Sequence, residues 1–150
     1  MKLWIVVYSH PHGIDVWPVY KQMTAEDVIE GKKADDGIAV CVNVIFRYFG
    51  YRRYLDHDGY DIPYRCLLPQ KIDGLLVAGR CMSGEHIAFE SYRGMIIMMA
   101  VGQAAGTAAA LAAGAGVSPR RLDVAHLQDT LRSQGAVVRK NGEYLEPIPA

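Results

Sequence analysis

The segment Gly74–His86, GLLVAGRCMSGEH, places side chains that can carry out chemistry next to a glycine turn. Arg80 can neutralise a cofactor phosphate or orient a carboxylate substrate, or it can form a surface salt bridge. His86 can donate or accept a proton near neutral pH, or it can be a hydrogen-bonded loop histidine. Cys81 and the upstream Cys66 can do redox chemistry, but nothing in the sequence marks either as activated, which favours buried thiols.

Arg93, Tyr64 and Arg65 are further candidate ligand-binding residues. Arg93 falls in the expected first turn of a long helix, where a positive charge opposes the helix dipole, and this indicates a ligand contact. Tyr64 and Arg65 lie on an expected strand, where they can bind substrate or pack against neighbours. The segments His10–His12 and Asp56–Asp58 lack further ligands, so we expect solvated loops there and no metal site.

The composition is that of a globular domain. The chain has 150 residues, which is the length of one domain, and its sixteen basic and sixteen acidic residues give a net charge of zero. This balance gives no reason to expect nucleic acid or an anionic membrane as a partner. Three cysteines without a C-x-x-C pair favour a reducing compartment, so we expect a cytoplasmic protein. The run LWIVVY is too short for a signal peptide and predicts a buried first strand.

The uncharged segment 95–116, MIIMMAVGQAAGTAAALAAGAG, is long enough to cross a bilayer. It consists mostly of alanine and glycine and has few aromatic anchors, so we predict a fully buried helix and no membrane span. Gly102, Gly106, either Ala109 or Ala110, and Ala113 follow helical spacing. They predict a face almost without side chains that packs closely against the strand ending at residue 78.

Hydrophobic alternation and continuous apolar runs predict the strands. Residues 38–46, IAVCVNVIF, alternate as a strand does, and residues 60–68, YDIPYRCLL, indicate an extended return strand. Pro63 restricts this second strand to an edge position. The short apolar run 75–78 is typical of a strand buried on both faces, and Gly79 ends it.

Cap residues predict the helices. Thr24, followed three positions later by Asp27, predicts a capping box and a short helix. After a loop, Ser91 is the expected N-cap of the long helix, which should end near Gly116. Asp123 is expected to begin a last, amphipathic helix.

From about Thr24 onward the chain resembles the C-terminal part of FAD-dependent oxidoreductases, the flavoprotein group with heterodisulfide-reductase-like and glutathione-reductase-type members. Three segments carry the resemblance in family order: YDIPYRCLLPQKIDGLLVAGRCMSGEH, SYRGMIIMMAVGQAAGTAAALAA and VSPRRLDVAHLQDTLRSQGA. The resemblance implies an α/β fold, namely the C-terminal portion of an FAD/NAD(P)-binding Rossmann-like flavoprotein fold. A β-hairpin segment from the substrate side would precede the last strand, and a long Gly/Ala-rich helix would follow it.

The resemblance also implies a site for FAD and a small organic substrate. It assigns cofactor binding to Gly79, Arg80, Cys81, Gly94 and Met95, catalysis to His86 and Arg93, and substrate binding to Tyr64 and Arg65. The turn at Gly79 would let the backbone approach the cofactor. The helix after it would direct its positive end at the flavin edge that gains charge on reduction.

The sequence departs from the family in one major respect. No G-x-G-x-x-G occurs, so the half that binds the FAD pyrophosphate has no counterpart. We expect residues 1–68 to form a partial substrate-side segment, 69–116 an incomplete FAD-binding domain, and 117–150 a C-terminal helix and tail. A separate N-terminal FAD-binding chain is then an expected partner, for a truncated product or half of a split enzyme. The alternative is a non-catalytic remnant or interaction module that self-associates through its Gly/Ala helix.

Overall fold

The computed structural model describes residues 4–7, 19–46, 52–140 and 143–144, so the predicted loop at His10–His12 lies outside the described residues. The strands are β1 (Trp4–Val7), β2 (Gly37–Cys41), β3 (Ile45–Phe46), β4 (Arg52–Arg53), β5 (Tyr60–Pro63), β6 (Leu75–Ala78), β7 (Arg139–Lys140) and β8 (Glu143–Tyr144). The helices are α1 (Ala25–Ile29), α2 (His86–Tyr92), α3 (Met95–Ala115) and α4 (Val124–Ser133), with 3-10 turns η2 (Tyr64–Leu67) and η3 (Pro119–Arg121).

The described strands form four two-stranded sheets. β1 runs parallel to β6, whereas β2–β5, β3–β4 and β7–β8 are antiparallel pairs. Mixed helices and strands agree with the expected α/β class. The parallel β1–β6 pair joins the first described strand to the strand expected to approach a cofactor.

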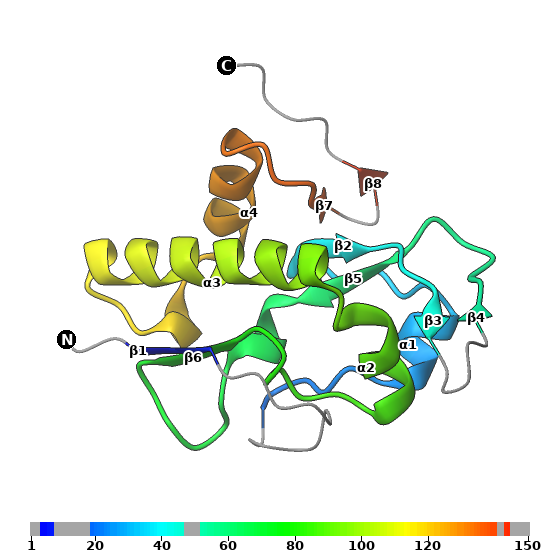
Figure 1. The fold of residues 1–150 in the computed structure, drawn as a ribbon. Coiled ribbons are helices and arrows are strands. Elements are labelled where there is room, and N and C mark those ends of the chain that lie inside the picture. Colours follow the sequence, from blue (N-terminus) through cyan, green and yellow to red (C-terminus); the bar gives the residue numbers. More distant parts are fainter. Residues whose placement is uncertain (1–3, 8–18, 47–51, 141–142, 145–150) are drawn as a thin grey trace.

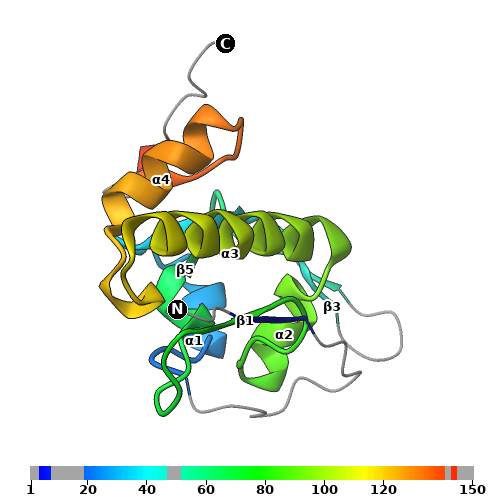
Figure 2. The same ribbon diagram turned by 90° about the vertical axis from the view of Figure 1, so that its left-hand side faces the viewer.

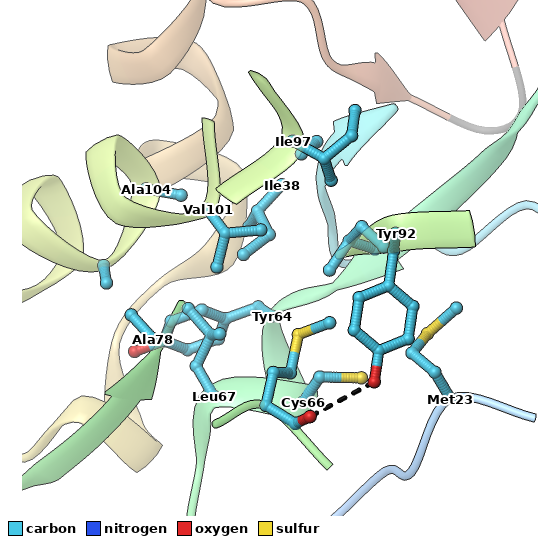
Figure 3. Packing of buried hydrophobic residues seen from close by; sticks show 14 of the residues in the cluster. Met23, Ile38, Tyr64, Cys66, Leu67, Ala78, Tyr92, Ile97, Val101 and Ala104 are labelled. Atoms are coloured by element: carbon cyan, nitrogen blue, oxygen red, sulfur yellow. Dashed lines mark hydrogen bonds between the residues drawn. The ribbon is translucent and has the colours of Figure 1, made fainter. Parts of the chain in front are cut away.

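Helix α3 lies at the centre of the molecule. In both ribbon views α4 lies on one side of it, and β6 with α1 and α2 lies on the other (Figures 1 and 2). Its buried residues are Ile97, Val101, Ala104, Ala105, Ala108, Ala109 and Ala112. In the close view, Val101 points toward Ile38 of β2, and both lie near Ala78 and Tyr64 (Figure 3). The small side chains let α3 lie close to β2 and β6.

The close-packing face of α3 is not the one predicted from the sequence. A Cβ built on Gly102 or Gly106 would meet nothing within 4 Å, so neither glycine lies against the strand. The alanines at 104, 105, 108 and 112 occupy that position instead, each fully buried. Alanine and glycine occur on both faces of this helix, so the hydrophobic pattern of the sequence does not indicate which face is buried.

The prediction of a fully buried helix is also wrong. Met95, Ile96 and Met99 are 73%, 81% and 74% exposed, so one face of α3 is open. This helix, Met95–Ala115, is the one candidate membrane span found among the described residues, by length and composition only. Such a single helix is weak evidence for a membrane protein, because core helices meet the same criterion.

Two predicted strands are interrupted. The strand expected over 38–46 is split into β2 and β3, and the connection includes Asn43. The return strand expected over 60–68 stops at Pro63, after which the chain turns into η2. β5 pairs antiparallel with β2, as a return strand should.

The cap predictions for α1, for α4 and for the C-terminus of α3 are confirmed. Thr24 accepts a hydrogen bond from the Asp27 backbone N–H at 3.2 Å, and the Asp27 carboxylate accepts one from the Thr24 N–H at 2.9 Å. Asp123 caps α4 by accepting from the Ala125 N–H at 3.0 Å. Gly116 ends α3 at φ +68°, a left-handed conformation that glycine adopts without strain.

Candidate functional site

The turn after β6 has the predicted glycine geometry. Gly79 has φ +85°, and its carbonyl accepts from the Met82 N–H at 3.1 Å, which closes the turn. Cys81 is 3% exposed, and its thiol donates to the Ala78 carbonyl with Sγ 3.0 Å from the oxygen. Cys81 is therefore a buried thiol that anchors the turn, in agreement with the non-redox interpretation.

The other two cysteines are also buried and free. Burial raises the pKa of Cys66, and burial likewise raises the pKa of Cys41 above its ordinary value. A raised pKa keeps a thiol protonated and unreactive at neutral pH. Packing explains these cysteines better than redox chemistry does.

The start of the long helix differs from the prediction. Ser91 lies inside α2 and does not cap α3, which begins at Met95 with Gly94 as its N-cap residue. Arg93 is the C-cap of α2, where a positive charge is favourable. The opposed helix dipole expected at Arg93 is therefore absent, because the long helical segment breaks after Tyr92; a ligand contact at Arg93 stays a prediction.

Two side chains from distant elements hold this break. The Nε of Arg80, just after β6, donates to the Arg93 carbonyl at 3.2 Å. The Asn43 amide donates to the Ser91 carbonyl at 3.3 Å, and the Ser91 hydroxyl donates to the Asn43 carbonyl at 2.8 Å. The turn after β6 and the N-terminus of α3 are thereby brought together, as the site prediction requires.

Glu90 is the residue that sequence reasoning missed. Its side chain is 11% exposed, and its carboxylate lies 3.0 Å from the Nη2 of Arg93 and 3.9 Å from the Nε2 of His86. His86 itself is largely exposed at the first turn of α2. The spacing of these residues on one helix face is the signal that could have revealed Glu90, but it becomes visible only once residues 86–92 are recognised as helical.

The structure thus brings together a cluster of predicted site residues. Arg80 bonds to Arg93, Gly79 and Cys81 flank Arg80, and Gly94 with Met95 begins α3 beside Arg93. Glu90 connects His86 to the same cluster. The seven residues predicted for cofactor binding and catalysis therefore all lie in or next to the junction of the β6 turn with the α2–α3 break.

Tyr64 and Arg65, predicted to bind substrate, lie on η2 and not on a strand. The Tyr64 hydroxyl donates to the Pro119 carbonyl at 2.9 Å, and burial raises the pKa of this phenol. Arg65 is paired with Asp36, with its Nη2 2.6 Å from the Asp36 Oδ1. These contacts connect the two residues to η3 and to the segment before β2, and not to the His86–Glu90–Arg93 cluster.

Tyr92 fixes the loop between the β6 turn and α2. Its hydroxyl donates to the Met82 carbonyl at 3.1 Å, a bond drawn in Figure 3, and burial raises the pKa of the phenol. Gly84 passes so close to this ring that an added Cβ would overlap the hydroxyl. The loop shape therefore depends on a glycine at position 84.

Gly84→Ala is expected to destabilise the fold by about 1–3 kcal/mol, because the tyrosine hydroxyl must move and leave the buried Met82 carbonyl unsatisfied. Urea unfolding followed by circular dichroism measures this loss. Gly102→Ala is the matched control, since a Cβ there meets nothing within 4 Å and helix propensity favours alanine by up to about 1 kcal/mol. Equal effects of the two substitutions would contradict the role of Gly84.

The residues at this junction fit one end of a flavin cofactor. The N-cap position of the 21-residue α3 has no side-chain hydrogen bond, which leaves its first N–H groups to an outside acceptor. A glycine turn and two partly exposed arginines border it, and this set suits an electron-rich ring edge or an anion. The adenosine and pyrophosphate end has no matching G-x-G-x-x-G in the chain.

Comparison with protein families identifies the family of the chain. The model of the family described as FAD dependent oxidoreductase matches residues 20–131. The chain belongs to this FAD-dependent oxidoreductase family. The match covers β2 to β6, both helices at the junction and most of α4. Neither the curated proteins nor the solved structures contain a match to this chain.

Proposed function

We propose that this chain supplies the flavin-facing part of an oxidoreductase that uses FAD to oxidise or reduce a small organic substrate. The observation that carries the proposal is the meeting of the Gly79 turn with the start of α3 through the Arg80–Arg93 hydrogen bond. Sites in open α/β folds form at the carboxyl ends of parallel strands, and β6 ends at this point. Family membership supports the same cofactor.

The residues of the junction have separate proposed roles. Gly79, Arg80, Cys81, Gly94 and Met95 would border FAD, and the positive end of α3 would favour the reduced form. Bound FAD would supply hydride transfer through its ring nitrogen N5. His86 would hold or deliver a proton, and Glu90 would orient His86 and Arg93 through its contacts with both.

A second chain is part of this proposal. The pyrophosphate fingerprint is absent from the sequence, so a separate FAD-binding chain that carries it would complete the cofactor site. Tyr64 and Arg65 remain proposed substrate contacts, although their observed bonds lead away from the junction. We also propose a cytoplasmic location, which is supported by three buried cysteines that form no disulfide.

The chain purified with excess FAD is expected to retain the visible flavin absorption only when a partner bearing G-x-G-x-x-G is present. Arg80→Ala should weaken this retention about tenfold, because it frees the Arg93 carbonyl and loosens the α2–α3 break. Arg121→Ala, an exposed arginine on η3, is the matched control. If no flavin band appears under either condition, the proposal is wrong.

The exposed face of α3 favours a second candidate function, that of a self-associating interaction module. Met95, Ile96 and Met99 are apolar and more than half exposed. Under this proposal, light scattering should show a dimer that Ile96→Lys converts to a monomer, whereas Ile72→Lys, the same change at an exposed isoleucine outside α3, should leave the dimer intact. A monomer at every concentration would contradict it.

A further inference from the structure

A pocket of about 280 Å³ lies between the α1 region and the β5–η2 segment, and the proposed flavin site does not use it. Pro63 supplies an apolar residue to its lining, and Met23 lies beneath the lining with no exposed surface. Its charged lining residues are Lys21, Asp27, Lys32, Lys33, Asp35, Asp61 and Arg65. The volume is just below the usual range for drug-sized ligands, so the pocket has room only for a small molecule.

Two of the lining lysines are available to a ligand at little cost. Lys32 pairs with Glu26 at 2.6 Å, and the two side chains are 43% and 63% exposed. Lys33 pairs with Asp58 at 2.6 Å, with exposures of 31% and 57%. Exposed ion pairs contribute little to stability, so a ligand carboxylate can replace Glu26 and Asp58, while Lys33 keeps its bond to the Gly59 carbonyl.

The carboxylates of the pocket are not equivalent. Asp61 is fully buried and accepts from Arg139 at 3.0 Å and from the Ala34 N–H at 2.9 Å. Asp27 is neutralised by Lys21 at 2.6 Å. Asp35 is exposed and forms no ion pair with any residue that the structure describes, so it can accept an ammonium group.

The charges around the pocket select against a simple ion. Once the ion-pair partners Glu26, Glu30, Asp36, Asp58 and Arg139 are included, seven carboxylates stand against five cations, and this disfavours a bare anion. The lysines Lys32 and Lys33 disfavour a bare cation in the same way. A molecule with one positive and one negative group can place each group beside side chains of the opposite charge, which avoids both kinds of repulsion.

We propose that this pocket binds a small zwitterion, namely an α-amino acid with an apolar side chain. Its carboxylate contacts Lys32 and Lys33, its ammonium group contacts Asp35, and its apolar side chain lies against Pro63. The proposal does not depend on flavin binding. The pocket nevertheless adjoins the flavin-site loop, because the Met23 carbonyl accepts from the Glu85 N–H at 2.8 Å.

Titration of the full chain with L-leucine, followed by the amide NMR signals of residues 32–36, tests the proposal. Isovalerate and isoamylamine are the comparison probes, because each keeps the apolar group and only one of the charges. Leucine is expected to bind about tenfold more tightly than either, the effect of one charge-assisted hydrogen bond. Asp35→Asn should lower leucine affinity to that of isovalerate. Asp129→Asn, an exposed carboxylate on α4, should leave it unchanged.

Several results would overturn the proposal. Equal affinity for leucine and isovalerate would indicate an anion site, and equal affinity for leucine and isoamylamine a cation site. Amide shifts outside the pocket lining, or no saturable shift with leucine, would show that the pocket is not an amino-acid site. An Asp35→Asn chain that folds as the wild type and binds leucine equally well would remove the assigned ammonium contact.

Discussion

Arg139→Met is expected to destabilise the protein by about 3–5 kcal/mol, because it leaves a buried carboxylate without its counter-charge. Arg139 and Asp61 both have side chains that are 0% exposed, and their closest atoms lie 3.0 Å apart. The same guanidinium donates to the Asp58 carbonyl at 2.8 Å. It therefore joins β7 to the turn before β5.

The stability lost in Arg139→Met is expected to depend on pH in a definite direction. Burial raises the pKa of Asp61, and the Ala34 N–H and Arg139 offset this effect only in part. A raised folded-state pKa means that stability falls as pH rises through it. Without Arg139 the pKa of Asp61 rises further. The loss of stability caused by Arg139→Met should therefore be largest at neutral pH, where Asp61 is charged, and smaller in acid.

Urea unfolding at several pH values measures both effects. Arg139→Met combined with Asp61→Asn is the informative control, since an uncharged amide removes most of the penalty. The double variant should be more stable than Arg139→Met alone and nearly independent of pH in this range. If the single and double variants unfold alike at neutral pH, the Arg139–Asp61 pair does not stabilise the fold.

Ala112→Leu is expected to cost about 1–3 kcal/mol, because position 112 lies in the buried seam of α3 where extra volume forces the helix away from its neighbours. Gly102→Leu should be tolerated, since no atom outside the local backbone lies within 4 Å of an added Cβ. The structure thus predicts a larger loss of stability at position 112 than at position 102. The glycine face expected from the sequence predicts the opposite.

Ala110→Leu gives the matched control for this experiment, because it is the same substitution in the same helix at an exposed position. The melting temperatures of the three variants, measured by thermal unfolding, show which substitution destabilises the protein most. If Ala110→Leu is as damaging as Ala112→Leu, the cost comes from the leucine itself and not from the seam. If Gly102→Leu is the most damaging, the predicted glycine face exists after all.

The sequence predicted correctly the features that depend on residues close together in the chain. Thr24, Asp123 and Gly116 cap helices by contacts within a few residues, and Gly79 forms the expected turn. Such features follow from short-range hydrogen bonds and from allowed backbone angles. The family, whose model matches residues 20–131, was predicted from the sequence as well.

Features set by distant residues were not predictable in this way. The phase of α3 depends on β2, β6 and α4, and its alanine-rich sequence does not favour one face. The α2–α3 break depends on Asn43 and Arg80, which donate from other elements to the α2 carbonyls. Glu90 became recognisable as a site residue only when this break was known.

The parallel pairing of β1 with β6 has a consequence for how the chain acquires its structure. Trp4–Val7 pairs with Leu75–Ala78, so a long stretch of chain must close before any of these hydrogen bonds form. The hairpin-like β2–β5 pair and the contacts between α3 and α4 span shorter separations and should form earlier. During synthesis from the N-terminus, β1 emerges long before its partner. It therefore presents an unpaired edge to other chains until β6 is made, and aggregation is most favourable in that interval.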